Sequence, residues 1–525
     1  MSNKELQADI NFQTDLFDAA NQLRGPVSPA DYKHYVLPLI FMRYLSLRYD
    51  KRKAQIEAMT DNPDSDFYAA GDEIIRETFL SMDDLYRSEN VFIIPEKAHW
   101  NYIRANANQP NIKEIIDNAM KLIEETNPEL QGTLPRIFQR ATSLPIENVA
   151  QLITIFSRDA FSTSNENSVD VLGRVYEYFI GNFASTEGQR GGEFFTPASI
   201  VRLLVAMLEP TEGKVFDPAC GSGGMFIQSD DYSQHNSNLS FYGQEIKENN
   251  VRLGKMNVLL HGINADIRLG DSLLNDGFPD LKADYIIANP PFNMKDWGAD
   301  RIANDDPRFN ILGLEGRKVT DSNANYAWMQ HFLYHLSDIG TAGYVISNGA
   351  MTTNSTGEKE VRQALIEQGY IDCIVQLPEK LFFTTGISCC LFFLSKNRNG
   401  NNGLRERKNE ILFIDARKMG KMVSRRQKAL TLDDISKIAD TYHHYQNVET
   451  KYKDETGFCK IVEIVDVQAQ DYKLTPSIYV GSEIQHHDDI PFEEKMNTLI
   501  EILHEQFQES NHLQKKILSD LEGLL

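Results

Sequence analysis

The sequence predicts an α/β protein in which a Rossmann-like, seven-stranded sheet is flanked by an N-terminal all-α domain and a C-terminal helical segment. Apolar residues recur at helical spacing over residues 1–165. Over residues 166–480, short β-branched or aromatic runs alternate with helical stretches, which is typical of a doubly wound, mainly parallel sheet. Residues 481–525 carry apolar residues near heptad spacing. We therefore expect three domains with these bounds.

Within the N-terminal domain, the apolar stretch Tyr35–Leu45 is the strongest helical signal. Asn and Ser accumulate over residues 163–168, which indicates a connector near the expected boundary. In the last segment, the apolar stripe by itself is about equally consistent with packing on its own chain and with docking on a partner helix. From its context we expect residues 481–525 to be a partner-binding segment. This stripe comprises Met496, Leu499, Leu503, Leu513, Ile517, Leu521 and Leu524.

Seven runs in the central region have the length and composition of strands in such a sheet. A hydrophilic loop at 398–403 separates the last of them from another strand-like run, residues 411–416. The seven runs span residues 214–219, 239–246, 265–271, 283–292, 340–348, 371–378 and 389–397.

Composition argues against a membrane protein, a secreted protein and a disulfide-rich protein. The chain has 525 residues, 41% of them hydrophobic, which is enough to bury a large core. It has no apolar run long enough to span a membrane and does not begin with a secretory signal, so we expect a cytoplasmic protein with no membrane partner. The five cysteines show no CxxC spacing, which favours neither a disulfide framework nor a metal site.

The formal net charge of -22 bears on any interaction with nucleic acid. Duplex binding depends largely on Lys and Arg that neutralise phosphates, so this chain should bind DNA poorly by itself. One interpretation is that the acidic charge only keeps a large protein in solution. The other is that a separate subunit supplies the affinity for DNA and the reading of its sequence.

A glycine-rich turn follows the first predicted strand, at the carboxyl edge where open α/β sheets bind ligands. Gly221, Ser222 and Gly223 allow the backbone to approach a ligand closely. The turn is neither the GxGxxG fingerprint nor a phosphate-binding P-loop. Asp217, just before it, suits a cationic or amino-bearing ligand.

Two more acids end the next two predicted strands. Glu245 could accept both hydroxyls of a ribose, and Asp271 could reach an adenine amine. Each acid alone is as easily a helix cap or a solvated turn residue. Three acids at successive strand ends favour a nucleoside site.

The tetrapeptide Asn289-Pro290-Pro291-Phe292 ends an apolar strand and carries the most specific chemistry. The prolines stop the strand and hold Asn289 extended at the pocket rim. A conjugated exocyclic amine is a poor nucleophile, and hydrogen bonds to the Asn289 side-chain oxygen and the Pro290 carbonyl would localise electron density on its nitrogen. Phe292 would stack on an extruded base. The alternative is a strand-ending turn with a buried Phe.

The order of these motifs resembles a known family. Phe194-Phe195-Thr196-Pro197, the glycine turn, the acids and the Asn-Pro-Pro-Phe motif are similar to the γ-type series of N6-adenine DNA methyltransferases. The stretches Leu23–Leu45, Gly192–Ala198 and Leu381–Ile387 extend the likeness over most of the chain, to the modification (M) subunit of type I restriction-modification systems.

The resemblance implies that S-adenosylmethionine is the cofactor and that the Phe-Thr-Pro segment lines its pocket. The same segment also fits a helix start, with Thr196 as N-cap and Pro197 in the first turn. By family likeness the pocket would include Glu193, Phe194, Phe195, Thr196, Pro197 and Ala198, beside Asp217, Gly221, Ser222, Gly223, Glu245 and Asp271.

The resemblance also implies an assembly on double-stranded DNA: two M subunits with one specificity (S) subunit, and a restriction (R) subunit when cleavage is needed. An acidic methyltransferase that delegates recognition still needs a basic catalytic face. A basic cluster follows residues 411–416, and a solvated loop balancing nearby acids is an equal alternative to DNA contact. This cluster comprises Arg417, Lys418, Lys421, Arg425, Arg426 and Lys428.

Other functions fit parts of this pattern. Cytosine N4, guanine N2 of ribosomal RNA and a protein glutamine are methylated by enzymes with related motifs. The RNA and protein enzymes would resemble this chain only in the central sheet and would leave its two helical flanks unexplained. Cytosine C5 methylation needs a cysteine nucleophile, for which no Pro-Cys dipeptide stands in a suitable loop. A non-catalytic scaffold is the remaining alternative, and the intact Asn289, Asp217 and Gly221 argue against it.

Overall fold

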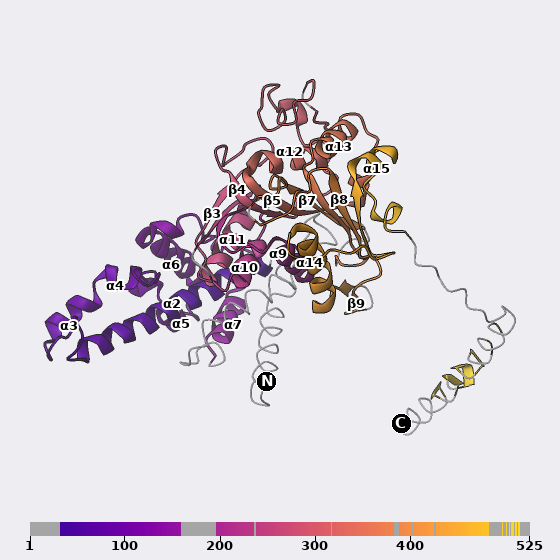
Figure 1. Cartoon of the computed structure of the whole chain (residues 1–525). Coiled ribbons are helices and arrows are strands. Elements are labelled where there is room, and N and C mark those ends of the chain that lie inside the picture. Colours follow the sequence, from indigo (N-terminus) through magenta and orange to yellow (C-terminus); the bar gives the residue numbers. More distant parts are fainter. Residues whose placement is uncertain are drawn as a thin grey trace. The chain divides into compact units, whose positions relative to one another are not determined.

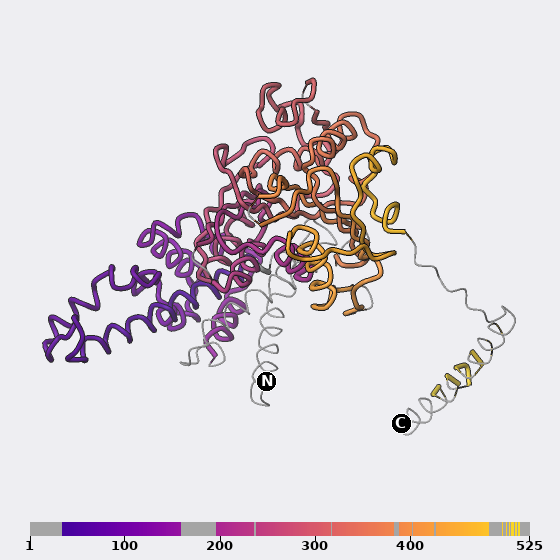
Figure 2. The backbone as a smooth tube through the Cα atoms, viewed as in Figure 1, coloured from indigo at the N-terminus to yellow at the C-terminus, as the bar shows by residue number. Residues whose placement is uncertain are grey.

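A computed structural model describes residues 32–158, 196–235, 238–316, 318–382, 388–401, 403–424 and 427–481, together with separate positions between 496 and 514. The chain divides into two compact units, residues 1–480 and 481–525. Figure 2 traces the backbone of the described residues in colour. Glu193, Phe194 and Phe195 of the predicted site lie outside the described residues, as do Arg425 and Arg426 of the basic cluster.

The N-terminal region is helical, as predicted. Its centre is α2, a 30-residue helix that contains the expected apolar stretch and buries Leu37, Ile40 and Phe41 completely. Trp100 is also fully buried, and its backbone N–H donates to the Ser46 hydroxyl of α2 (3.0 Å). The helices are α2 (Tyr32–Asp61), α3 (Glu73–Leu80), α4 (Asp83–Arg87), α5 (Trp100–Ala105), α6 (Ile112–Thr126) and α7 (Ile146–Phe156), with 3-10 turns η1 (Glu96–Ala98) and η2 (Pro128–Leu130).

The large sheet has nine strands in the order β11-β8-β6-β7-β5-β4-β1-β2-β3. All seven predicted strands are present, and two more extend the sheet beyond the expected number: β8, which is the strand-like run at 411–416, and the edge strand β11. The strands are β1 (Gly213–Asp217), β2 (Leu239–Glu245), β3 (Ala265–Leu269), β4 (Ala283–Ala288), β5 (Leu336–Ser347), β6 (Ile371–Gln376), β7 (Cys389–Ser395), β8 (Glu410–Asp415) and β11 (Cys459–Glu463).

Helices cover both faces of this sheet, and each face has its own core. In Figure 1, α12 and α13 lie above the strands, while α9, α10 and α14 lie below them. Helix α11 is shared: Val251 and Val258 pack toward the sheet, whereas Leu253 and Met256 join the core of the helical domain. The bounds are α9 (Ala198–Leu208), α10 (Gly224–Tyr232), α11 (Glu248–Leu260) and α14 (Leu432–Gln446) on one face, and α12 (Asn325–His335), α13 (Glu358–Glu367) and α15 (Ile464–Ala469) on the other.

Strand direction decides which loops meet at one edge. β1, β2, β3, β4 and β5 run parallel to one another. β7 is antiparallel to both β5 and β6, so β6 again runs in the direction of β4, and β8 is parallel to β6. The carboxyl ends of β1, β2, β3, β4, β5, β6 and β8 therefore lie at one edge of the sheet. The carboxyl end of β7 lies at the opposite edge. All the predicted acids and the Asn-Pro-Pro-Phe motif lie on the first of these two edges.

A buried ion cluster joins the far strands to α14. Asp372 is fully buried in β6, and its carboxylate pairs with Arg398 (3.1 Å) and Arg407 (3.2 Å) and accepts from the Tyr442 hydroxyl (2.8 Å). Burial alone would raise the pKa of Asp372, but the two guanidinium groups hold that pKa below its ordinary value. The cluster fixes α14 and the loop after β7 against β6.

Short elements complete the first unit. A two-stranded hairpin, β9 (Lys421–Met422) and β10 (Lys428–Ala429), precedes α14. Three 3-10 turns are η4 (Ala299–Arg301), η5 (Asn348–Met351) and η6 (Pro476–Ile478). Among the described residues, no helix is long and apolar enough to cross a membrane.

The described residues of the second unit beyond Gly481 are helical, as the sequence predicts for this segment. Its described apolar side chains lie three, four or six residues apart and are between 40% and 59% exposed. They are Met496, Ile500, Leu503, Phe507 and Leu513.

Candidate active site

The glycine turn after β1 takes the backbone through two left-handed residues. Gly221 has a φ of +53° and Gly223 a φ of +78°, and Gly223 is the N-cap of α10. Side chains rarely adopt this conformation, so glycine is the residue that fits both positions. A Cβ built on Gly221 would meet no atom within 4 Å, so the space above the turn is open.

Glu245, at the end of β2, braces this turn. One carboxylate oxygen accepts a hydrogen bond from the Gly221 backbone N–H (3.1 Å), and the other accepts from the Lys247 N–H (2.9 Å). Glu245 is 9% exposed, so the carboxylate that braces the turn is nearly buried. The structure therefore brings Glu245 and the glycine turn together, as the sequence predicts.

Asp217 is buried beside them, with 2% of its surface exposed. One of its oxygens accepts from the Ala219 N–H (3.0 Å). Burial, and then the nearby charge of Glu245, raise the pKa of the Asp217 carboxyl to about 8. A cation bound at this point would favour the ionised form, so the acid pair suits a positively charged ligand.

Asp271 closes the turn after β3, where its carboxylate accepts from the N–H groups of Leu273 (3.0 Å) and Leu274 (3.2 Å). These bonds make it a turn-forming acid, which was the alternative considered from the sequence, and they leave lone pairs for a ligand. Two exposed apolar side chains stand beside the acids at the ends of β2 and β3: Ile246 (60%) and Leu269 (55%). Apolar residues so exposed at a ligand-binding edge are candidate contacts for a flat ring, and the motif analysis missed them.

Asn289 directly follows β4, and its side-chain amide is held by one bond. The Asn289 Nδ2 donates to the Thr196 hydroxyl oxygen at 2.8 Å. This bond orients the amide and leaves Asn289 Oδ1 buried with no hydrogen-bond partner among the described residues. An unpaired buried acceptor costs free energy until a donor reaches it, so this oxygen marks a binding position.

The same bond corrects one expectation about Thr196. As an alternative reading, the sequence suggested that Thr196 caps the N-terminus of α9. That suggestion is wrong, because Pro197 is the N-cap, no side chain caps the helix, and the Thr196 hydroxyl bonds to Asn289 instead. Ala198 is the first residue of α9, and Ser222 lies half-buried in the glycine turn with its carbonyl accepting from Asn257 (2.9 Å).

A reciprocal amide pair fixes the chain just after the motif. Asn293 has a φ of +51°, and its backbone N–H donates to the Asn325 side-chain oxygen (3.0 Å). Its own side-chain oxygen accepts from Asn325 Nδ2 (2.9 Å) and from the Ser347 hydroxyl (2.9 Å). Asn325 and Ser347 are buried, in α12 and at the end of β5. These bonds among Asn293, Asn325 and Ser347, called the Asn293 lock below, fix the chain directly after Phe292.

Phe292 is half-buried, and its ring meets that of Phe382 edge-on, with centroids 5.9 Å apart. Pro290 is buried and Pro291 is exposed. Phe382 belongs to the predicted stretch Leu381–Ile387, of which residues 383–387 lie outside the described part of the chain. A half-buried aromatic ring at the sheet edge is a candidate for stacking on another ring.

An Asp–His–His group lies behind the Asp271 turn. Asp276, His331 and His335 offer ligand atoms within 4.8 Å of one another, a spacing that a metal could use. However, both nitrogens of His335 already have oxygen partners, Leu281 O (3.0 Å) and the Asp276 carboxylate (2.9 Å). Burial opposes the charge on Asp276, yet the bond from His335 lowers the pKa of that carboxyl to about 2.

The cation Arg308 also faces this group, 3.9 Å from the Asp276 carboxylate, and it disfavours a second cation there. Its guanidinium donates to the carbonyls of Ser272 (2.8 Å) and Leu273 (2.9 Å). The group is therefore an ion-pair support for the turn that carries Asp271.

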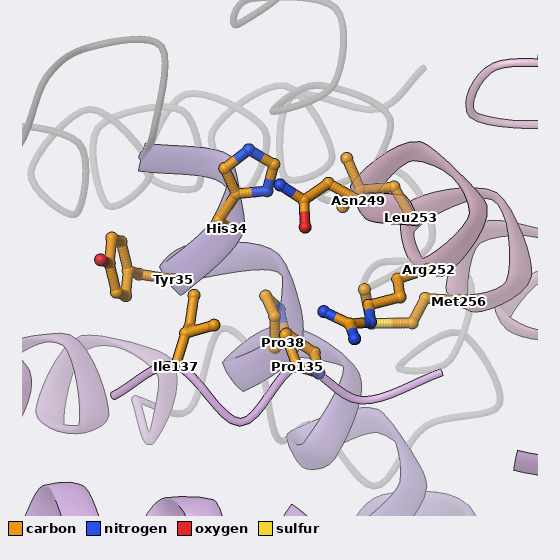
Figure 3. Close-up of a pocket in the computed structure, with 9 residues that line it drawn as sticks. All are labelled: His34, Tyr35, Pro38, Pro135, Ile137, Asn249, Arg252, Leu253 and Met256. Atoms are coloured by element: carbon orange, nitrogen blue, oxygen red, sulfur yellow. The ribbon is translucent and has the colours of Figure 1, made fainter. Parts of the chain in front are cut away.

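A cavity of about 140 Å³ lies at the junction between the helical domain and α11, away from the acids. Figure 3 shows Asn249 and His34 facing one another across it. None of the predicted site residues lines this cavity. Its lining residues are His34, Tyr35, Pro38, Pro135, Ile137, Asn249, Arg252, Leu253 and Met256.

The raised pKa of Asp217 leads to a test by unfolding. The folded carboxyl keeps its proton up to about pH 8, whereas an unfolded Asp releases it near pH 3.9. This group therefore lowers the free energy of unfolding as pH rises from about 4 to about 8. We expect Asp217→Asn to be stabilised relative to the wild type as pH rises through this window, measured by urea midpoints at several pH values. The exposed control Asp280→Asn should follow the wild type; parallel profiles for Asp217→Asn would refute the buried protonated acid.

Comparisons with known proteins agree with this geometry. Residues 167–488 match the family model for N-6 DNA methylase, and residues 12–156 match the model for the HsdM N-terminal domain. A type I restriction enzyme methylase subunit (MjaIX) of Methanocaldococcus jannaschii is 38% identical, over 100% of this chain and 93% of that protein. The HindI methylase subunit of Haemophilus influenzae is 40% identical, over 79% of this chain and 93% of its own length.

Among solved structures, a type I restriction-modification methyltransferase subunit from Streptococcus thermophilus superposes with a TM-score of 0.75 at 25% identity. The match covers 91% of this chain and all of that one. The family models together span the helical domain and the whole sheet, so the likeness is not confined to the glycine turn and the motif. The chain therefore belongs to the N-6 DNA methylase family and, within it, to the methylase subunits of type I restriction enzymes.

Proposed function

We propose that this DNA adenine methyltransferase activates the N6 amine of an extruded adenine through Asn289 and Pro290, with S-adenosylmethionine as methyl donor. The observation that carries the proposal is the buried Asn289 Oδ1, which has no partner among the described residues. An adenine amine has two N–H donors, one for this oxygen and one for the Pro290 carbonyl. Both bonds strengthen as positive charge develops on N6, so they favour the transition state over the ground state.

Thr196 and Phe292 have separate roles in this mechanism. Thr196 accepts from Asn289 Nδ2 and so keeps the amide oxygen, rather than its NH₂ group, toward the amine. The N6 lone pair would form the new bond to the methyl carbon as the methyl–sulfur bond breaks and leaves its electron pair on the sulfur, which becomes a neutral thioether. N6 would then release one proton to solvent. Phe292, which packs edge-on against Phe382, would stack on the extruded base.

The cofactor pocket rests on the three acids and the glycine turn. S-adenosylmethionine supplies an electrophilic methyl group on a cationic sulfur. Asp217 would attract its positive charges and ionise, Glu245 would accept the ribose hydroxyls, and Asp271 would accept from its adenine amine. Ile246 and Leu269 would contact the faces of that adenine. The open space above Gly221 fits a ligand in this position. The remaining contacts would come from Glu193, Phe194, Phe195, Thr196, Pro197, Ala198, Ser222 and Gly223.

The charge of the chain supports a division of labour. With a formal net charge of -22, it is unsuited to hold duplex DNA alone. We infer that a specificity subunit reads the sequence, that a second copy of this chain completes the methyltransferase, and that a restriction subunit joins for cleavage. The three-domain division at residues 165 and 480 gives each part a task. The exposed apolar stripe of the second unit is the proposed partner contact.

The alternative acceptors are not favoured. Cytosine N4, guanine N2 and glutamine would be compatible with the motif by itself. The N-6 DNA methylase model and the HsdM N-terminal domain model together match residues 12–156 and 167–488. These ranges include the N-terminal helical region, which an RNA or protein methyltransferase would leave unexplained.

Changing Asn289 to Ala removes the activating oxygen. We expect methyl transfer to fall by about 10²-fold or more, as for the loss of one transition-state donor, with the cofactor Kd unchanged. Asn289→Asp keeps an acceptor oxygen and should lose less. Single-turnover methylation and cofactor titration measure the two quantities, with the exposed Asn264→Ala as control. Full activity of Asn289→Ala would reject the mechanism.

Changing Asn325 to Ala removes both bonds between Asn325 and Asn293, and leaves Asn293 with its bond to the Ser347 hydroxyl. The loss should lower kcat by about 10-fold or more while KM for DNA and the cofactor Kd stay within twofold, because the motif is displaced and the pocket is not. Ser347→Ala removes the bond from the Ser347 hydroxyl to the Asn293 side-chain oxygen, and should lower kcat less than Asn325→Ala does. Tyr334→Phe, at the other end of α12, is the control. An effect on KM alone would contradict a positioning role.

Delegated recognition predicts weak binding by the lone chain. We expect fluorescence anisotropy at about 0.15 M salt to show little preference for target DNA until the specificity subunit is added. The readout is the ratio of affinities for target and scrambled duplexes. Tight, sequence-specific binding by the chain alone would exclude this division of labour.

A further inference from the structure

The β9–β10 hairpin carries an unexplained feature at the catalytic edge. It follows β8, whose carboxyl end lies at the same edge as that of β4. Figure 1 shows β9 below the strands, close to α14. The hairpin includes the predicted basic residues Lys421 and Lys428.

A short chain of contacts leads from this hairpin to the motif. The Lys428 N–H donates to the Lys380 carbonyl (2.8 Å), and the buried Gln427 side chain donates to the Leu381 carbonyl (3.4 Å). The next residue, Phe382, is the one whose ring packs against Phe292. The base of the hairpin is therefore fixed to the segment that supports the catalytic aromatic ring.

The outer end of the hairpin is apolar and exposed. Met422 is 49% exposed and Val423 is 61% exposed. The N–H groups of Val423 (2.9 Å) and Ser424 (3.2 Å) both donate to the Gln427 carbonyl, which ties Val423 to the start of β10. Lys421, next to Met422, is exposed as well. Met422 and Val423, called the apolar tip below, thus lie beside the cation Lys421. This combination suits DNA, in which stacked apolar bases lie between charged phosphates.

Two other basic residues of the region are engaged locally. The Arg417 guanidinium bonds to Asp415 (2.6 Å), and the Lys428 ammonium donates to the Met419 carbonyl (3.2 Å). For these two residues the structure favours the loop-balancing interpretation over direct phosphate contact. What the described hairpin offers to DNA is thus chiefly its apolar tip.

We propose that Met422 and Val423 form a wedge that enters the base stack beside the target adenine and occupies the space it leaves. The inference rests on the proposed function, because it requires the adenine to leave the duplex. Extrusion loses the stacking of the target on its neighbours. Apolar side chains in the gap restore contact with those neighbours and delay the return of the base.

A DNA substrate whose target adenine is already unpaired can distinguish a wedge from a purely structural role of Met422 and Val423. The protein is used as its complex with the specificity subunit, and the variant is Met422→Ala/Val423→Ala. We expect its methylation rate to fall by about 10-fold on paired target DNA, but to come within about twofold of wild type when the target adenine faces an abasic site. A variant that is merely misfolded would lose activity on both substrates.

A second readout measures extrusion directly. With 2-aminopurine in place of the target base, the wild-type complex should raise its fluorescence, and the wedge variant should raise it much less at equal occupancy of DNA. The control is Val465→Ala, since Val465 is also 61% exposed but lies in α15 on the other face of the sheet. It should behave as wild type in both assays.

The outcomes are distinguishable from failure of the catalytic proposal. Asn289→Ala should raise 2-aminopurine fluorescence yet methylate neither substrate. Equal loss by the wedge variant on both substrates, or no loss on either, would overturn the wedge. Failure of the variant to assemble with the specificity subunit would instead identify the tip as a protein contact and also overturn it. No fluorescence rise with the wild type would reject extrusion itself.

Discussion

One hydrogen bond, from Asn289 Nδ2 to the Thr196 hydroxyl, determines what the catalytic motif can do. An amide can present either a donor or an acceptor to its surroundings, and this bond makes Asn289 present the acceptor. The free oxygen is buried, so its missing partner costs free energy that an incoming amine would recover. The prolines, the amide pair of Asn293 and Asn325, and Phe382 all serve to hold this one oxygen and the ring beside it.

The cofactor side of the edge follows a similar principle with charge. Asp217 is buried next to Glu245, and the pKa of Asp217 is raised to about 8 for that reason. Such an arrangement is unfavourable in an empty protein and favourable once a cation arrives. Behind it, Arg308 pairs with Asp306 (2.7 Å) and donates to the carbonyls of the Asp271 turn. The edge thus combines one buried acceptor without a partner among the described residues, Asn289 Oδ1, with ion pairs and hydrogen bonds that hold the surrounding turns in place.

The sequence alone predicts the parts of this structure that depend on local chemistry. Strand periodicity located all seven expected strands, and the prolines after Asn289 located the end of β4. The lock of Asn293, Asn325 and Ser347 could not be predicted, because its members lie 22 to 54 residues apart and meet only after the sheet forms. The edge strand β11 is short and half-exposed, so it lacks the apolar run that revealed the others. The roles of the site residues, including the three outside the described part of the chain, stay predictions.

The central claim is that Asn289 Oδ1 receives the adenine amine. The most direct measurement is a structure of the complex with the specificity subunit, target DNA and an unreactive cofactor analogue. The account predicts an extruded adenine whose N6 lies about 2.7–3.2 Å from Asn289 Oδ1, with Nδ2 still on the Thr196 hydroxyl. An N6 bound by other groups, with Asn289 Oδ1 paired to a protein donor, would contradict it.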